Sequence, residues 1–181
     1  MTLWREPLAD VTFDDIQAFC EQQTAEGLQL DYKEQIPNDL AKTVAAFANT
    51  RGGLLLLGIA ADKTTNKPKV PIQGMDGAVG LSERITQICR DGIHPGIIPE
   101  ISSPITVPDS ENKVVLALRV DESSESPHSI SNGTQVYVRT GDTSKPLSLA
   151  NVTTIVSLLE RKGPAVDKRE RLVERHLVRA R

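Results

Sequence analysis

The chain has 181 residues, which is enough for one domain with a buried core and a short appendage. Its 39% hydrophobic and 25% charged content is that of an ordinary globular protein and excludes a largely disordered chain. Aromatic residues make up only 3% of it, so few rings are available to stack on the bases of a single-stranded nucleic acid.

Charge, cysteine usage and hydropathy narrow the class of protein further. The net charge of −3 divides into a balance of −8 over residues 1–160 and +5 over residues 161–181. A polyanionic partner therefore requires that positive charge be concentrated locally. Cys20 and Cys89 lie far apart beside apolar neighbours, which predicts buried thiols rather than a disulfide framework or a zinc site. The N-terminus lacks the features of a secretory signal, and the longest apolar run is too short to cross a bilayer. We expect a cytoplasmic protein without a membrane partner.

The predicted elements alternate between helices and strands in the first half of the chain, and strands dominate the second half. A capping box at Thr12 and Asp15 marks the start of the first helix. Alternating apolar and polar residues after Gly27 predict a half-buried strand, and Asn38 is the expected N-cap of the second helix. In chain order we expect a helix over residues 12–22, a strand over 28–33, a helix over 39–49, a buried strand over 54–60, a helix over 80–90, strands over 100–107 and 113–120, a hairpin turn at 132–133, a strand over 135–139 and a helix over 148–161.

This order predicts an α+β fold with a mixed β-sheet packed by helices, rather than a series of βαβ units. Gly163 and Pro164 break the last helix, so we divide the chain into a domain over residues 1–162 and an Arg-rich C-terminal helix or linker over residues 163–181. The apolar residues of that segment share one helical face. This pattern fits a helix that packs on a partner subunit or leads into a further domain, and also a basic arm on nucleic acid.

The most informative polar cluster is formed by Glu26, Asp31 and Lys33. Asp31 and Lys33 are two apart on a predicted strand, so their side chains leave the same face, and Glu26 can turn toward that face. Two carboxylates and an ammonium there would hold a divalent cation and steady a phosphate oxygen, as metal-assisted phosphodiester cleavage requires. The alternative is a solvated strand face with a weak ion pair.

Several further motifs give the sequence a resemblance to a known family. The acid-x-Lys triplet ending at Lys33, the segment AFANTRGG at residues 46–53, the apolar strand closing in Gly58 and Ile59, and YVRTG at residues 137–141 together resemble the AlbA-type domain of the Schlafen family. The segments PIQG, IHP and SPH follow in the corresponding order, so that the resemblance covers roughly residues 12–160. It implies the Schlafen AlbA-type fold and a role in nucleic-acid binding.

The resemblance also implies a site, because animal Schlafens cut structured RNA at a three-carboxylate centre. The first two acids fall on Glu26 and Asp31, with Lys33 beside them as a catalytic residue. The third is expected after Gly58, where this chain has alanine and the nearest acid is Asp62. The implied metal ligands are thus Glu26, Asp31 and Asp62, and the implied metal is Mg²⁺ or Mn²⁺.

Four basic residues, Arg51, Arg119, Arg139 and Lys145, are candidates for phosphate contacts, although such residues also serve as surface ion-pair partners. The sequence has no GxxxxGK[ST] motif, so nothing in it supports a P-loop for ATP.

Two hypotheses follow for the function of the chain. The first is a nucleic-acid-binding protein that favours RNA over DNA, cuts it as a metal-dependent endoribonuclease, and forms a homodimer to build the two-lobed cleft of its family. The second is a catalytically silent binding or regulatory module, with a nucleic-acid, nucleotide or protein partner, that acts with an effector. The missing third acid and the acidic body favour the second.

Overall fold

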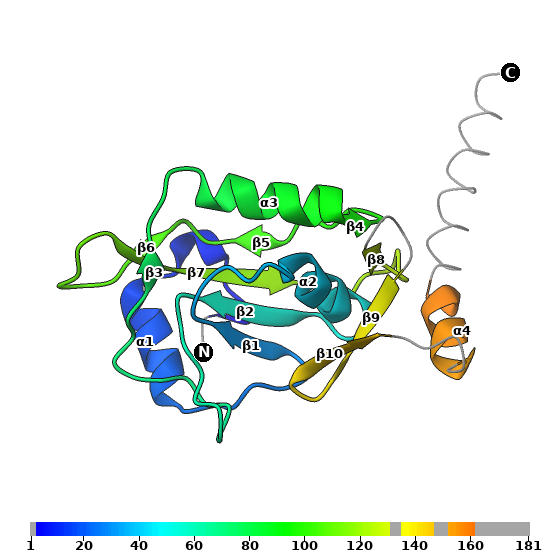
Figure 1. Ribbon diagram of the computed structural model, residues 1–181, viewed down its shortest axis with the longest axis horizontal. Coiled ribbons are helices and arrows are strands. Elements are labelled where there is room, and N and C mark those ends of the chain that lie inside the picture. The colour runs from blue at the N-terminus through cyan, green and yellow to red at the C-terminus, as the bar shows by residue number, and fades with distance from the viewer. Residues whose placement is uncertain (1–2, 131–134, 147–151, 162–181) are drawn as a thin grey trace, which may run out of the picture.

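The computed structural model describes residues 3–130, 135–146 and 152–161 (Figure 1). The helices are a 3₁₀ helix η1 (Leu8–Asp10), α1 (Phe13–Glu21), α2 (Leu40–Asn49), α3 (Leu81–Gly92) and α4 (Val152–Glu160). The strands are β1 (Leu30–Lys33), β2 (Gly53–Leu57), β3 (Met75–Asp76), β4 (Ile93–His94), β5 (Glu100–Ile101), β6 (Ile105–Thr106), β7 (Lys113–Val120), β8 (Ser129–Ile130), β9 (Gln135–Thr140) and β10 (Thr143–Pro146).

These strands form two sheets, and the larger one is mixed. Its order is β1-β2-β7-β3, with β5 and β6 also paired to β7. β1 runs parallel to β2, whereas β2 and β7 are antiparallel. The second sheet has the order β10-β9-β8-β4 and is antiparallel. The predicted α+β fold with a mixed sheet is confirmed.

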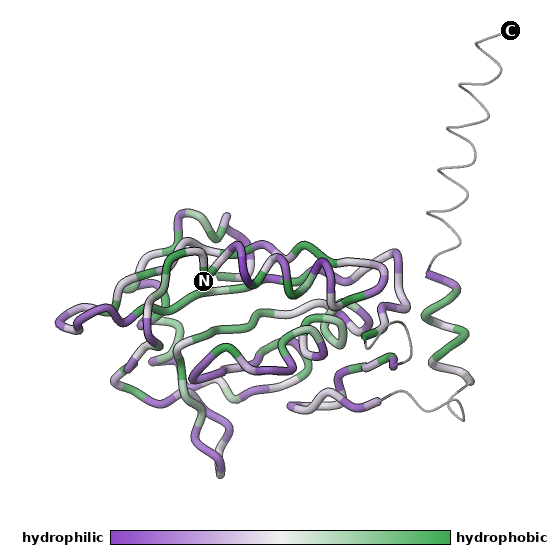
Figure 2. Tube along the Cα trace, turned by 45° about the horizontal axis from the view of Figure 1, so that its top comes forward, coloured by the Kyte–Doolittle hydropathy of each residue, from purple (hydrophilic) through white to green (hydrophobic). Residues whose placement is uncertain are grey.

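The larger sheet separates two apolar cores, and β2 contributes to both. Its residues Leu54 to Leu57 are all fully buried. Leu55 and Leu57 pack with α2 and α3, while Leu54 and Leu56 face the core that contains α1. Figure 2 shows the hydrophobic colour along these inner strands and the hydrophilic colour along the outer loops. Burial on both faces explains why this strand reads as a continuous apolar run instead of an alternating one.

The N-termini of α1 and α2 can be compared with the predicted N-caps. The Thr12 hydroxyl accepts a hydrogen bond from the Asp15 N–H, and the Asp15 carboxylate accepts one from the Thr12 N–H, so the capping box is confirmed. The prediction of Asn38 as the second N-cap is wrong. That position is held by Asp39, whose side chain makes no capping hydrogen bond.

Three predicted strands also differ from the structure. The buried strand predicted over residues 54–60 ends at Leu57. The strand predicted over residues 28–33 begins only at Leu30, and Asp31 on its polar face is 2% exposed and so is not solvated. The strand predicted over residues 100–107 is divided into β5 and β6 around Ser102. The Ser102 hydroxyl accepts the N–H of Ala117 and its own N–H donates to the Ala117 carbonyl, which absorbs one extra residue opposite β7.

The remaining expectations concern the cysteines, the membrane and the end of the chain. Cys20 and Cys89 are free and buried, as predicted, and burial raises the pKa of each thiol to about 12. Within the stretches of chain described above, no helix has both the length and the apolar composition that crossing a bilayer requires. The turn predicted at residues 132–133 and the segment 163–181 lie outside the described residues.

Candidate functional site

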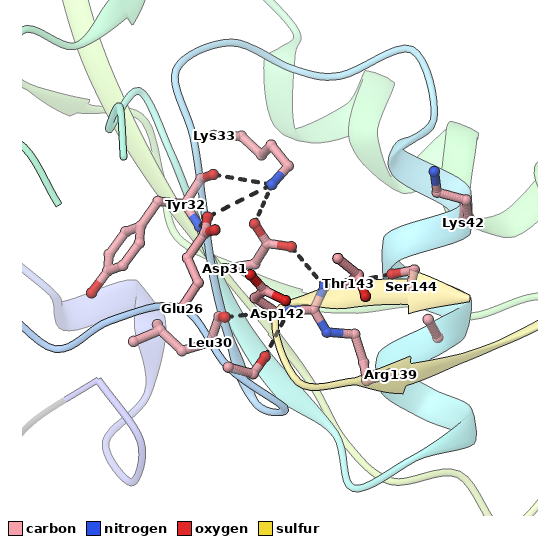
Figure 3. A network of polar contacts seen from close by, with 12 residues as sticks. Glu26, Leu30, Asp31, Tyr32, Lys33, Lys42, Arg139, Asp142, Thr143 and Ser144 are labelled. Atoms are coloured by element: carbon pink, nitrogen blue, oxygen red, sulfur yellow. Dashed lines mark hydrogen bonds and ion pairs between the residues drawn. The ribbon is translucent and has the colours of Figure 1, made fainter. Parts of the chain in front are cut away.

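The side chains of Glu26, Asp31 and Lys33 meet at the exposed end of β1 (Figure 3). The Lys33 ammonium bonds to the Oδ1 atom of Asp31 and lies 3.8 Å from Glu26 Oε1. It also donates to the Tyr32 carbonyl at 3.1 Å. Glu26 Oε1 in turn accepts the backbone N–H of Tyr32 at 3.0 Å. The alternation of β1 therefore brings the predicted cluster together.

Arg139 occupies the centre of this cluster. Its Nη1 atom donates to Asp31 Oδ2 at 2.8 Å, and the two side chains are only 1% and 3% exposed. Its Nη2 atom donates to the Gly27 carbonyl at 2.6 Å, and its guanidinium carbon lies 4.8 Å from the centre of the Phe47 ring. Both oxygens of Asp31 are consequently engaged by cations, one from β1 and one from β9. We call Glu26, Asp31, Lys33 and Arg139 the buried ion network.

The carboxyl of Glu26 differs from an ordinary surface glutamate. Its side chain is 12% exposed, and burial raises the pKa of Glu26 from 4.5 to about 7. The Asp31 carboxyl adds to this rise, while the Tyr32 N–H and the Lys33 charge oppose it. Glu26 is thus a carboxyl that exchanges its proton near neutral pH.

The motif AFANTRGG forms the C-terminal end of α2 and fastens β9 beside it. The Asn49 amide donates to the carbonyls of His128 and Tyr137 at 2.8 and 2.9 Å and accepts the His128 N–H at 2.7 Å. The Thr50 hydroxyl donates to Ala46 and accepts the N–H of Arg139 at 2.9 Å. These bonds place β9 so that the Arg139 guanidinium reaches Asp31.

Gly52 makes this turn possible. It has a φ of +69°, and a Cβ atom there would lie 2.5 Å from the Val120 carbonyl oxygen. A larger residue would have to displace the backbone of β7. Asn49, Thr50 and Gly52 of the motif therefore each have a structural reason.

Asp62, the expected third metal ligand, has local partners instead. Its Oδ1 atom accepts the N–H groups of Thr64 and Thr65 at 3.0 and 2.9 Å, and the Thr65 hydroxyl at 3.0 Å. The pKa of Asp62 is lowered, first by the Thr65 N–H and then by that of Thr64. We call residues 62–67 the Asp62 loop.

This donor set does not fit a divalent metal. Both oxygens of Asp31 are bonded to cations, and the Oδ1 atom of Asp62 closes its own loop. Among the residues that the structure describes, no three His, Cys, Asp or Glu side chains form a group that could hold a metal ion. The predicted trio Glu26, Asp31 and Asp62 is accordingly not assembled into such a group.

The four predicted phosphate contacts lie in two kinds of environment. Arg51 and Lys145 are exposed, at the end of α2 and on β10. Arg119 is bonded to the Glu100 carboxylate and to the carbonyls of Leu3 and Glu6, and Arg139 belongs to the buried ion network. Arg51 and Lys145 are therefore open to a ligand, whereas Arg119 and Arg139 are bonded to other parts of the fold.

Other residues around the network were not singled out from the sequence. The Lys42 ammonium lies 5.9 Å from the centre of the Tyr137 ring. Asn66 accepts the N–H of Glu26 at its carbonyl and donates its side-chain amide to Asp142 at 2.7 Å, so the Asp62 loop borders the network. Partners that lie 40 or more positions apart leave no local pattern in one sequence.

The fold and this network define an α+β module of the AlbA type. The family model for Schlafen, AlbA_2 matches residues 26–148, which is more than half of the chain. The chain therefore belongs to the Schlafen AlbA_2 family. The match begins at Glu26 and includes the whole buried ion network.

Two of the solved structures that are similar to this chain come from bacteria. A crystal structure of a Corynebacterium diphtheriae protein has a TM-score of 0.49 and 19% identity over 73% of this chain, which spans only 25% of that protein. The solution structure of the N-terminal domain of a RecG-related protein from Nitrosomonas europaea has a TM-score of 0.48 and 22% identity, over 75% of this chain and 90% of that domain. No curated protein matches the sequence.

Proposed function

We propose that this chain is a nucleic-acid-binding module that favours RNA over DNA and binds it without metal-dependent cleavage. Nucleic-acid binding is what the Schlafen AlbA-type resemblance implies. The proposal of a catalytically silent site rests on Asp31. Its buried carboxylate is bonded to both Lys33 and Arg139. A metal ion that bound Asp31 would have to displace one of these cations from the carboxylate or share it with them.

Partly or fully exposed cations in and around the network supply the proposed contacts to phosphate. Lys33 and Lys42 are 32% and 29% exposed, and Figure 3 draws both above the buried Asp31–Arg139 pair. Lys145 is exposed on β10, opposite Val138 of the strand that carries Arg139. Together with Arg51 they give a chain of net negative charge a local set of cations, as binding to a polyanion requires.

The preference for RNA is proposed from the kind of contact that this surface offers. Tyr32 is buried, and the Lys42 ammonium lies 5.9 Å from the centre of the half-buried Tyr137 ring, so the site offers few open rings for stacking on a base. A surface of cations with few stacking rings suits a duplex, whose backbone is read by charge and shape. Proteins read A-form RNA in this way, through the 2′-hydroxyls and phosphates of its minor groove.

The proposal is tested by titrating the full chain into a fluorescently labelled RNA hairpin and a DNA hairpin of the same sequence. We expect tighter binding to RNA, a steep fall in affinity with salt, and no cleavage in the presence of Mn²⁺. Flat, negligible binding of both nucleic acids at low salt would overturn the proposal and indicate a protein partner instead.

The second candidate function is metal-dependent endoribonuclease activity with Mg²⁺ or Mn²⁺. The observation in its favour is that Glu26, Asp31 and Lys33 meet at one point. Incubation of tRNA with Mn²⁺ and with the wild type, Glu26→Gln or Asp31→Asn decides between the two. Cleavage by the wild type that both folded variants lose would support the nuclease and contradict the silent module.

We also propose that the module acts as a homodimer, because animal Schlafens join two such lobes in one chain. Sedimentation velocity over a range of concentrations tests this, with and without the RNA hairpin. A monomer under all conditions would contradict it, while leaving the binding of nucleic acid to be judged by the titration.

A further inference from the structure

A second group of reactive side chains lies at the end of the fold where β4 and β8 pair (Figure 1). The Ser123 hydroxyl oxygen is 2.7 Å from Nε2 of His128, and Nδ1 of His128 is 2.7 Å from the carbonyl oxygen of Pro95. The pairing of His94 with Ser129 places Pro95 opposite His128, so the sheet itself fixes the ring. His128 is only 2% exposed.

These contacts determine the tautomer of the neutral ring. A carbonyl oxygen can only accept a hydrogen bond, so Nδ1 of His128 carries the proton. Nε2 is then the acceptor, and the Ser123 hydroxyl donates to it. Here a third group orients an imidazole, and the basic nitrogen of that imidazole holds a hydroxyl. This is the arrangement of a nucleophile with its general base.

The pair opens onto a crevice of about 230 Å³. Both Ser123 and His128 line it, and Ser123 is half-buried at its wall. Ile97 and Val120 contribute apolar surface beside them. The crevice also has charged groups, namely the Arg119–Glu100 pair, Glu122 (which is paired with Arg161), Asp121 and Glu125.

We propose that Ser123 and His128 form a hydrolytic site for small carboxylic esters, separate from the proposed contacts to nucleic acid. The Ser123 oxygen bonds to the ester carbonyl carbon while its proton passes to His128 Nε2. The carbon–oxygen bond to the alcohol then breaks, and the alcohol leaves with that proton. Water hydrolyses the acyl-serine by the same route, which returns the proton to Ser123 and releases the acid. Ester and water give acid and alcohol, and no other reactant is consumed.

Two further features define the reaction and its substrate class. The backbone N–H of Glu125 donates to the Ser123 oxygen at 3.0 Å and so helps to hold the hydroxyl in place. The acidic residues Asp121 and Glu125 at the crevice favour an uncharged or cationic ester, and the small volume favours a short acyl group. A negatively charged ester of the same alcohol is expected to react more slowly.

The proposal is tested on the full chain with p-nitrophenyl acetate and diisopropyl fluorophosphate. Ser123→Ala is expected to lower the rate of ester hydrolysis by about 100-fold, since it removes the nucleophile. Ser124→Ala is the matched control, because this neighbouring serine is exposed, and it is expected to keep the wild-type rate. Mass spectrometry of the chain labelled with diisopropyl fluorophosphate is expected to find the label on Ser123.

Folding is checked by thermal melting, since Ser123 also bonds to the backbone of Glu125. The labelling of wild type decides the assignment without any variant. A label on Ser124 or elsewhere, or a folded Ser123→Ala chain that hydrolyses the ester at the wild-type rate, would overturn the proposal. Neither result bears on RNA binding.

Discussion

The buried ion network and the Asp62 loop contain the two aspartates that the sequence assigned to one metal. Asp31 bonds to Lys33 on its own strand and to Arg139, 108 positions away, and its side chain is 3% exposed. The Asp62 carboxylate bonds to Thr64 and Thr65, within three positions. A carboxylate whose partners are distant and buried supports the fold of the whole domain, whereas one with local partners shapes a single turn.

The largest effect that separates the two regions is expected from Asp31→Ala. It leaves Arg139 buried without its carboxylate, so the free energy of unfolding should fall by about 3–5 kcal/mol. Urea denaturation of the variant measures the fall. Replacing both partners, as Asp31→Leu with Arg139→Met, is the matched control and should recover much of the loss because no unpaired charge remains. A single variant as stable as the wild type would show that the pair is not formed.

The next effect is a pH dependence of stability that Glu26 imposes. The folded carboxyl keeps its proton up to about pH 7, whereas an unfolded glutamate loses it near its ordinary pKa of 4.5. The native chain therefore binds more protons in this window, and the free energy of unfolding falls as pH rises from about 4.5 to about 7, by roughly 3 kcal/mol at most.

Glu26→Gln removes this titrating group and should flatten that part of the pH profile. Denaturation midpoints of wild type and variant across the window measure the difference. Parallel profiles would contradict the raised pKa, even if the variant were less stable at every pH.

A smaller effect is expected on the binding of nucleic acid. Lys145→Ala removes one proposed phosphate contact beside the network, so the slope of log affinity against log salt should become shallower by about 1. Lys63→Ala is the matched control, since Lys63 is an exposed lysine of the Asp62 loop. Equal changes in the two variants, measured by fluorescence anisotropy, would show that the charge acts from the whole surface and not from the network.

The smallest effect is expected from Asp62→Ala. Its pKa is lowered in the folded chain, so its contribution to stability is present above its ordinary value and lost as pH falls below it. Because the group is exposed, that contribution is screened, and the urea midpoint at neutral pH should change far less than in Asp31→Ala. A loss as large as that of Asp31→Ala would erase the distinction between the two regions.

The sequence predicts those parts of the fold and site that depend on neighbouring residues. The capping box of α1, the buried run of β2 and the shared face of Asp31 and Lys33 all follow from spacing, and the structure has each of them. The burial of Asp31 could not be predicted in this way, because it depends on β9 and Arg139. Ser102, where one predicted strand becomes β5 and β6, depends likewise on Ala117 of β7.

The family resemblance was based on the segments YVRTG and AFANTRGG. The structure shows which contacts the residues of these segments make. Arg139, from the segment YVRTG, is a predicted phosphate contact, and in the structure its guanidinium pairs with Asp31. Asn49, from AFANTRGG, joins α2 to the residues that precede β8 and to β9. Sequence positions shared with a family can therefore record how two sheets are fastened together, as well as where a ligand is bound.

The most direct test of this account is a titration of the full chain with Mn²⁺, followed by electron paramagnetic resonance of the free ion. If Asp31 belongs to the fold, wild type and Asp31→Asn should bind Mn²⁺ equally weakly and without saturation. A saturable site of one ion per chain, lost in both Asp31→Asn and Glu26→Gln while the variants stay folded, would contradict the account and restore the metal centre.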